Sequence, residues 1–250
     1  MIIEANKLQP LRLEKDTIVE ALCEIRFESK GAASLLPGML FSAGGGMKFS
    51  GIENLNPIQL PSFVLDANPG MRYMPSQKLI GEGYVIVIGE HILTIALNSY
   101  KGWSNFKALI LEVWSAVAGF NIVEHVTRAS LKYVNLIEGK SENIADFSDV
   151  HLLIDSQPVD SGSLQIRTEQ TRGSFTKIVQ LANMATAQKL GHESTGCLVD
   201  IDVIHNVESK DILREGADLL EELHTQVKDA FFAIISESAL KDRGPIYESR

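Results

Sequence analysis

The stretch IALNSYKGWSNFKALILEVWSAVAGFNIVEHVTRASLKYVNLI (95–137) decides the expected fold, because it holds a strand end, a helix and a second strand. A spacing of four, four and three residues predicts one apolar helix face over about 104–118, made by Phe106, Ile110, Trp114 and Val117. A long strand is predicted after that helix, over about 125–138.

The chain on either side of this stretch is dominated by strand patterns. Before it, a strand is predicted over 18–27 and a hairpin over 84–97, with a turn near Gly89. Residues 34–41 could supply one or two helical turns, with Pro37 tolerated only near a helix start. After it come a hairpin over 163–181, a strand over 197–204 and a closing helix over about 210–236.

These elements predict an α+β fold of largely antiparallel sheet covered by two long helices. The regular strand-helix alternation that builds a parallel sheet is missing. We expect one unit over 1–250. Each half, 1–140 and 141–250, contains a hairpin and one long helix, which leaves a diverged internal duplication open.

Composition places the chain among soluble globular proteins. Hydrophobic residues make up 45% and charged residues 22% of its 250 residues. The formal charge of −9 argues against nucleic acid and anionic membranes as partners, because both attract Lys and Arg. No stretch approaches the roughly 18 apolar residues of a membrane span. The start of the chain also lacks a signal-peptide pattern.

The two cysteines, Cys23 and Cys197, lie far apart in apolar strand patterns. This arrangement predicts buried free thiols, as in a reducing compartment. The expected location is therefore the cytoplasm.

Three segments resemble a family of uncharacterised bacterial proteins of about this length, distributed sporadically among genomes. They are IVEALCEIRF (18–27), YKGWSNF (100–106) and VTRASLKYVN (126–135). The second is similar to the family's Tyr-x-x-Trp-x-x-Phe pattern and the third to its Arg-x-x-Leu-Arg-Tyr-x-Asn strand, with Lys132 replacing the second Arg. Leu223 and His224 ahead of Phe231 extend the resemblance into the closing helix.

The resemblance implies a fold-sized unit and brings no catalytic residues with it. A sporadic distribution is typical of mobile or defence-associated genes, which makes a role in such a system one expectation.

The aromatic residues Tyr100, Trp103 and Phe106 follow one another at a spacing of three. They could form an aromatic platform for a ligand or peptide. The structural interpretation is favoured, in which they pack the start of the helix onto the sheet.

Arg128, Tyr133 and Asn135 share one predicted strand. Alternation places Tyr133 and Asn135 on one face and Arg128 on the other. Arg128 is expected to pair with Glu20 or Glu24, or else to bind an anionic ligand. Asn135 is expected to bond a neighbouring backbone group.

Asp200 and Asp202 are the catalytic candidates. On a strand they point to one face, opposite Cys197, and paired carboxylates can hold Mg²⁺ with a substrate phosphate. The favoured alternative is the solvated face of a half-buried strand. Spacing supplies no third ligand, and the six histidines match no zinc pattern.

Three functions follow from these patterns. The first is a non-enzymatic binding or scaffolding protein with a protein partner or self-association, for which a homodimer is the commonest case. The second is a metal-dependent enzyme or sensor for a nucleotide or phosphorylated ligand, using Asp200, Asp202 and Arg128. The third is a small-ligand sensor with a cavity between the sheet and the closing helix. No cofactor is expected.

Overall fold

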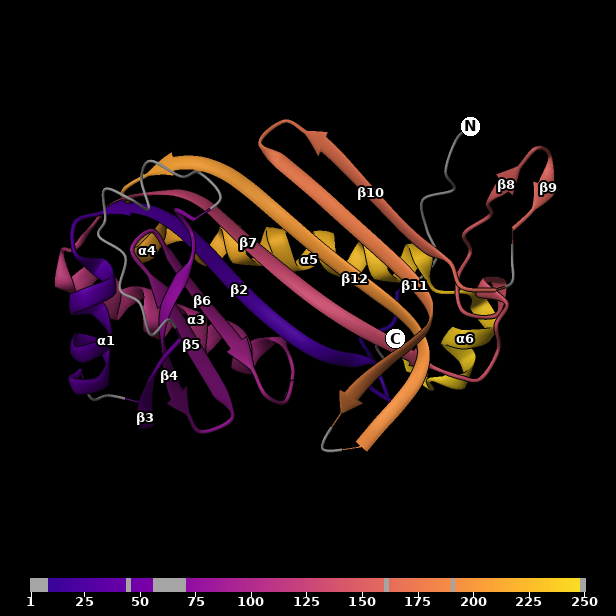
Figure 1. Ribbon diagram of the computed structural model, residues 1–250, viewed down its shortest axis with the longest axis horizontal. Coiled ribbons are helices and arrows are strands. Elements are labelled where there is room, and N and C mark those ends of the chain that lie inside the picture. The colour runs from indigo at the N-terminus through magenta and orange to yellow at the C-terminus, as the bar shows by residue number, and fades with distance from the viewer. Residues whose placement is uncertain (1–8, 44–45, 56–70, 160–161, 190–191, 248–250) are drawn as a thin grey trace.

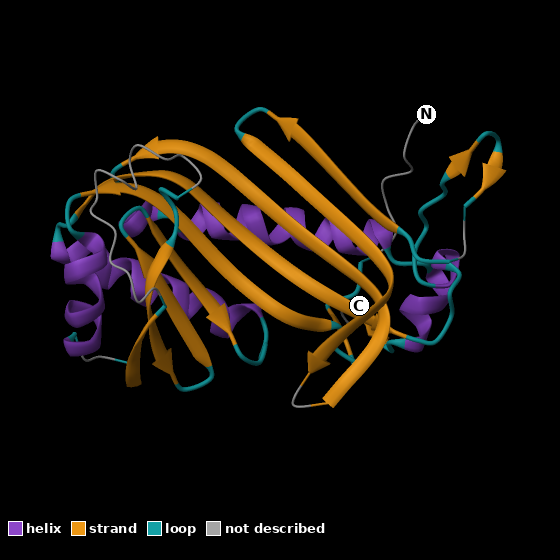
Figure 2. Ribbon diagram, viewed as in Figure 1, coloured by secondary structure: helices purple, strands orange, loops and turns teal. Residues whose placement is uncertain are grey.

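An antiparallel sheet of nine strands forms the body of the protein (Figures 1 and 2). The computed structural model describes residues 9–43, 46–55, 71–159, 162–189 and 192–247. Within these ranges the strand order is β10-β11-β12-β7-β2-β6-β5-β4-β3. The bounds are β2 (Ile18–Ser29), β3 (Phe49–Asn54), β4 (Pro75–Gly81), β5 (Tyr84–Gly89), β6 (Ile92–Leu97), β7 (Val123–Glu138), β10 (Gln165–Arg172), β11 (Phe175–Lys189) and β12 (His192–Ser209).

Helices and two small sheets complete the described chain. The helices are α1 (Ala32–Ser42), α3 (Trp103–Phe120), α4 (Ile212–Glu215), α5 (Ala217–Ile234) and α6 (Glu237–Asp242), with a 3-10 turn at Ile144–Asp146. The small sheets pair β1 (Arg12–Leu13) with β13 (Pro245–Ile246) and β8 (Leu153–Ile154) with β9 (Gln157–Pro158). The first of these joins the two ends of the described chain.

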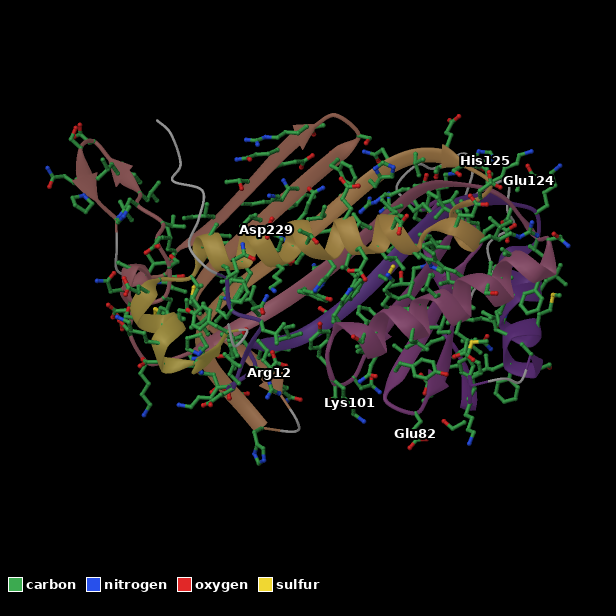
Figure 3. All side chains as sticks on the ribbon, turned by 180° about the vertical axis from the view of Figure 1, so that it is seen from behind. Arg12, Glu82, Lys101, Glu124, His125 and Asp229 are labelled. Atoms are coloured by element: carbon green, nitrogen blue, oxygen red, sulfur yellow. The ribbon has the colours of Figure 1, made fainter. Side chains whose placement is uncertain are left out.

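The helices α3 and α5 lie on one face of the sheet (Figure 3). Alternation along the strands turns the apolar residues of the central strands toward these helices, where Cys23, Leu131 and Ile201 are almost fully buried. Phe106 and Trp114 of α3 and Leu223 of α5 complete this core. The opposite face carries the polar residues of the same strands, and charged side chains meet there across neighbouring strands.

The expected α+β fold with two long covering helices is wrong. Strands account for 47% and helices for 28%, and three described helices reach seven residues. The third is α1, which continues through Pro37 although the sequence predicts only one or two turns there. Strand β12 also extends well beyond the predicted 197–204, because its polar start pairs with the end of β11 through backbone hydrogen bonds.

The sheet takes strands from both expected halves of the chain. Strand β7, in the first half, pairs with β2 on one side and with β12 on the other. The nine strands of this sheet therefore form one hydrogen-bonded layer that takes strands from both halves.

Cys23 and Cys197 are buried and free, as the sequence predicts. Burial raises the pKa of both thiols, that of Cys197 to about 11, so both stay protonated at neutral pH. Among the described helices, none combines the length and apolar character needed to cross a lipid bilayer.

Candidate ligand-binding site

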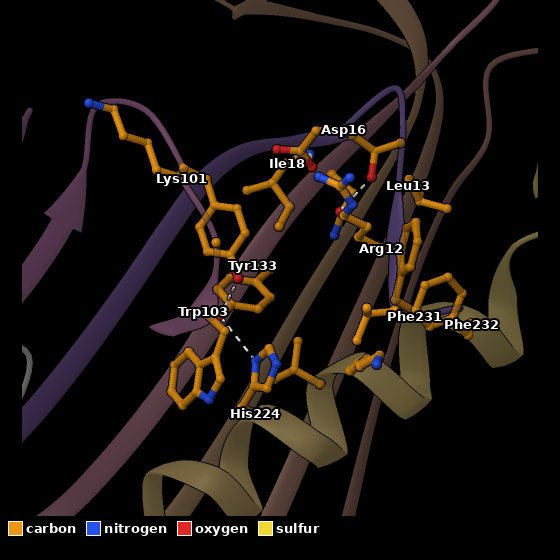
Figure 4. A pocket seen from close by; sticks show the side chains of 17 residues that line it. Arg12, Leu13, Asp16, Ile18, Lys101, Trp103, Tyr133, His224, Phe231 and Phe232 are labelled. Atoms are coloured by element: carbon orange, nitrogen blue, oxygen red, sulfur yellow. Dashed lines mark hydrogen bonds between the residues drawn. The ribbon is translucent and has the colours of Figure 1, made fainter. Parts of the chain in front are cut away.

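A cavity of about 430 Å³ lies between β7, the start of α3 and the second half of α5 (Figure 4). Residues 11–18 form its remaining wall. Four of the five binding candidates predicted from the sequence line this cavity together: Tyr100, Trp103, Tyr133 and Asn135. The other lining residues are Leu11, Arg12, Leu13, Asp16, Thr17, Ile18, Lys101, Gly102, His224, Val227, Lys228, Phe231 and Phe232.

A chain of three polar groups crosses one wall of the cavity. The Tyr100 and Tyr133 hydroxyls are 3.5 Å apart, and the Tyr133 hydroxyl is 3.2 Å from Nδ1 of His224 (Figure 4). Burial raises the pKa of both tyrosines and lowers the pKa of His224 to about 4. All three groups are therefore neutral at neutral pH, and the chain can donate in either direction according to the His224 tautomer.

Trp103 is held against His224 by contacts on two sides. Its ring stacks on the His224 ring, with centroids 4.2 Å apart and an angle of 5° between planes. Its Nε1 donates to Glu221 at 2.9 Å, and the other Glu221 oxygen accepts from Lys107 at 2.7 Å. The Lys107 hydrogen bond lowers the pKa of Glu221, which stays ionised. These contacts give the cavity a rigid aromatic end.

Asn135 and Thr17 fix the wall nearest the sheet. The Thr17 hydroxyl donates to Oδ1 of Asn135 at 2.9 Å, and Asn135 Nδ2 donates to the Val199 carbonyl at 3.4 Å. The predicted bond from Asn135 to a neighbouring backbone is thus confirmed. Both side chains are buried, so they hold residues 11–18 against β7.

Cationic side chains outnumber carboxylates around the cavity. Arg12, Lys101 and Lys228 come from three separate segments, while Asp16 is the carboxylate among the lining residues. Arg12, Lys101 and Asp16 are exposed at the mouth, and Lys228 is half-buried. Within the described ranges, no ion pair engages Lys101 or Lys228.

Arg128, the fifth predicted binding residue, lies on the opposite face of β7 from the cavity, as alternation predicts. Its guanidinium is 3.6 Å from Asp202 and 3.9 Å from Glu24, which confirms the predicted pairing with Glu24. Burial, with the nearby charge of Arg26, lowers the Arg128 pKa. Arg128 therefore belongs to an ion-pair network and takes no part in the cavity.

Asp200 and Asp202 share one face of β12, as predicted, and each lies beside a cation. Asp200 is 2.8 Å from Lys132, and Gln180 donates to it at 3.2 Å. Burial raises the pKa of Asp202 to about 6, against the opposing effect of Arg128. Neither carboxylate lines the cavity. Over the described residues, no three His, Cys, Asp or Glu side chains come close enough to hold a metal ion.

His224 is one of the cavity residues that the sequence interpretation did not name as a binding candidate. It lies one position after Leu223 on the apolar stripe of α5, and a histidine at the edge of such a stripe was the available signal. Thr17 was missed too, because its partner Asn135 is 118 residues away in the chain.

Comparison with known proteins gives no assignment for this pocket. No protein-family model matches the chain, and no curated protein matches it. The candidate site is therefore defined by its geometry.

Proposed function

We propose that this protein is a non-enzymatic binding protein that holds a small organic molecule in the cavity between β7, α3 and α5. The observation that carries the proposal is the cavity itself, about 430 Å³ in volume with aromatic walls and one polar chain. Small-molecule pockets span roughly 300–1,000 Å³ and combine apolar walls with a few well-placed polar groups.

The volume is hard to explain as a packing defect. The cavity opens to solvent at its mouth, where Arg12, Lys101 and Asp16 are exposed, so it is a cleft in the surface and not a void left inside the core. The side chains around this cavity are also held in place, as the Trp103–His224 stack and the Thr17–Asn135 bond illustrate. Because these side chains are fixed, they keep the cavity open for a ligand and do not collapse into it.

The family resemblance supports the same location. Its second and third segments are separated by 19 residues in the chain (107–125). At the cavity, Tyr100 and Trp103 of one segment meet Tyr133 and Asn135 of the other. Residues of both motifs thus line one pocket, which is expected if the motifs serve ligand binding. The two buried thiols favour a cytoplasmic setting.

The metal-dependent enzyme is the weaker alternative. Its carboxylates, Asp200 and Asp202, face Lys132 and Arg128 on the far side of the sheet. A substrate in the cavity would be separated from them by the sheet.

The test is native mass spectrometry on the full chain purified from its host, followed by a thermal-shift screen with any co-purifying molecule. We expect a bound small molecule that raises the melting temperature. Tyr133→Phe, which removes the hydroxyl between Tyr100 and His224, and Trp103→Ala, which opens the aromatic end, should each weaken binding at least tenfold.

Tyr84→Phe is the matched control, because Tyr84 packs against Phe49 and does not line the cavity. Its binding should equal that of the unchanged protein. The proposal is wrong if no compound binds, or if neither Tyr133→Phe nor Trp103→Ala changes the affinity of the compounds that bind.

Scaffolding remains a second candidate, because one surface feature favours it. The β8–β9 hairpin projects from the body of the protein (Figure 1), and its Leu153 and Ile154 are 64% and 62% exposed. Exposed apolar residues of this kind often mark contact surfaces. Light scattering on the full chain and on Leu153→Ser/Ile154→Ser would reveal a homodimer, which the double substitution should dissociate.

A further inference from the structure

We infer that the ligand is a monoanion: a flat apolar molecule that carries one carboxylate. This inference rests on the proposed binding function and adds the chemical class of the ligand. Three features of the cavity lead to it: the sign of its charged residues, the start of α3, and its aromatic walls.

The charges around the cavity have the opposite sign to the protein as a whole. The chain carries a formal charge of −9, whereas the charged lining residues are Arg12, Lys101, Lys228 and Asp16. Cationic residues around the cavity attract anions to this place, whereas the rest of the acidic surface repels them. Because Arg12 and Lys101 are exposed, salt should weaken this attraction.

The start of α3 adds positive potential on the same wall. Gly102 is the N-cap residue and lines the cavity, so no side chain there accepts from the first backbone N–H groups. The first turn also lacks an acidic residue. No acidic side chain of the first turn offsets the positive end of this helix, which therefore favours an anion at this wall of the cavity.

The remaining walls suit a flat apolar body. Trp103, Tyr133 and Phe231 present aromatic surface, and Ile18 and Val227 add aliphatic surface to the lining. The charged ends of Arg12 and Lys101 lie far apart at the cavity (Figure 4), so these two cations do not converge on one point. A phosphate dianion needs about twice the compensating charge at one point that a carboxylate needs. A single carboxylate on an apolar body therefore matches this lining better.

The experiment compares three probes of the same shape on the full chain: 2-naphthoate, 2-naphthamide and 2-naphthylmethylammonium. Isothermal titration calorimetry at low ionic strength measures their affinities. We expect the acid to bind most tightly and the ammonium at least tenfold more weakly. Added salt should reduce this preference.

Charge-removing variants identify the source of the preference. Lys228→Met and Arg12→Met, singly and together, should bring the acid and the amide toward equal affinity. Lys30→Met is the matched control, since Lys30 is 91% exposed and outside the cavity but carries the same charge. A loss of preference in that control as well would show a general charge effect and overturn the inference.

A cavity-filling variant separates this inference from the proposed function. In Val227→Trp, the larger side chain occupies the space of the buried Val227, and all three probes should lose affinity. If the three probes bind the unchanged protein with equal affinity and all lose affinity in Val227→Trp, the inference of a monoanionic ligand is wrong. The proposed binding function would still hold. Binding that survives both Val227→Trp and Trp103→Ala would overturn both. If Val227→Trp fails to fold, Trp103→Ala supplies the same comparison.

Discussion

Asp202 in β12 and His224 in α5 lie on opposite sides of the sheet, and burial shifts their pKa values in opposite directions. The pKa of Asp202 is raised from 3.8 to about 6, and that of His224 is lowered from 6.5 to about 4. Burial is the largest cause in both cases, because it disfavours the charged form of either group. Their effects on the pH dependence of stability are therefore opposite in sign.

We predict that Asp202→Asn makes stability rise more steeply with pH between about 4 and 6. In that interval the folded protein holds the Asp202 proton while the unfolded chain has released it, so this residue makes the free energy of unfolding fall as pH increases. Removing the group removes that fall, on the order of 2–3 kcal/mol across the interval. Urea unfolding at several pH values measures it, and an unchanged profile would contradict the Asp202 shift.

We predict the reverse for His224→Gln. The unfolded chain binds the His224 proton below about 6.5, whereas the folded protein binds it only below about 4. His224 thus makes stability rise with pH through this window, and the contribution is lost as pH falls. In the variant, the free energy of unfolding should rise less with pH between about 4 and 6.5, or fall. The difference from the unchanged protein across this interval should be roughly 2 kcal/mol, after allowance for the partial solvent exposure of His224. A profile that steepens instead would show that His224 is charged in the folded state.

At the scale of elements, α1 depends on a residue from a distant turn. Glu90 lies between β5 and β6, and its carboxylate accepts from the backbone N–H of Gly31 at 2.5 Å and of Ala33 at 3.1 Å. These groups stand at the start of α1, where an anion satisfies free donors and opposes the helix dipole. This contact helps to explain why α1 forms despite Pro37 in its interior.

Glu90→Ala should therefore destabilise the protein by about 2 kcal/mol, because it leaves two backbone donors without their acceptor. Glu90→Gln, which keeps one acceptor oxygen, should lose less. The matched control is Glu82→Ala at the exposed turn between β4 and β5 (Figure 3), which should change stability by under about 0.5 kcal/mol. Chemical denaturation followed by circular dichroism measures all three, and equal losses for Glu82 and Glu90 would refute the capping role.

At the scale of the whole molecule, the continuous sheet predicts one cooperative unfolding transition. β7 pairs with strands on both sides, so neither half of the chain can lose its strands without exposing the edge of the other. The two tryptophans, Trp103 and Trp114, both lie in α3 and report on one region only. Their fluorescence should nevertheless follow the same urea curve as the circular dichroism of the strands.

Core substitutions far from α3 sharpen that test. Leu181→Ala in β11 and Leu79→Ala in β4 remove buried side chains near opposite ends of the sheet, and each should cost about 2–4 kcal/mol. Each should shift the fluorescence and circular dichroism curves equally. A shift in only one signal would mean that the halves 1–140 and 141–250 unfold independently.

Sequence patterns determined much of this protein, because alternation and helical periodicity are local properties of the chain. The hairpin of β5 and β6, the faces of β7 and β12, and the helix near 104–118 follow from such patterns. The closing helix was predicted as one piece over about 210–236, but the structure divides it at Gly216 into α4 and α5. The placement of Tyr133 and Asn135 opposite Arg128 follows from these patterns as well. The helix α1 and the polar extension of β11 and β12 do not, since their partners lie elsewhere in the chain.

Only the tertiary structure decided the cavity. Tyr100, Tyr133 and His224 lie 33 and 91 residues apart along the chain, and they meet because α3 and α5 cross the same face of the sheet. The same is true of the charged lining residues, because Arg12, Lys101 and Lys228 come to the cavity from three segments that are distant in sequence. Periodicity fixes which face a side chain takes, but the volume left between faces depends on how helices and sheet pack, which is a long-range property of the folded chain.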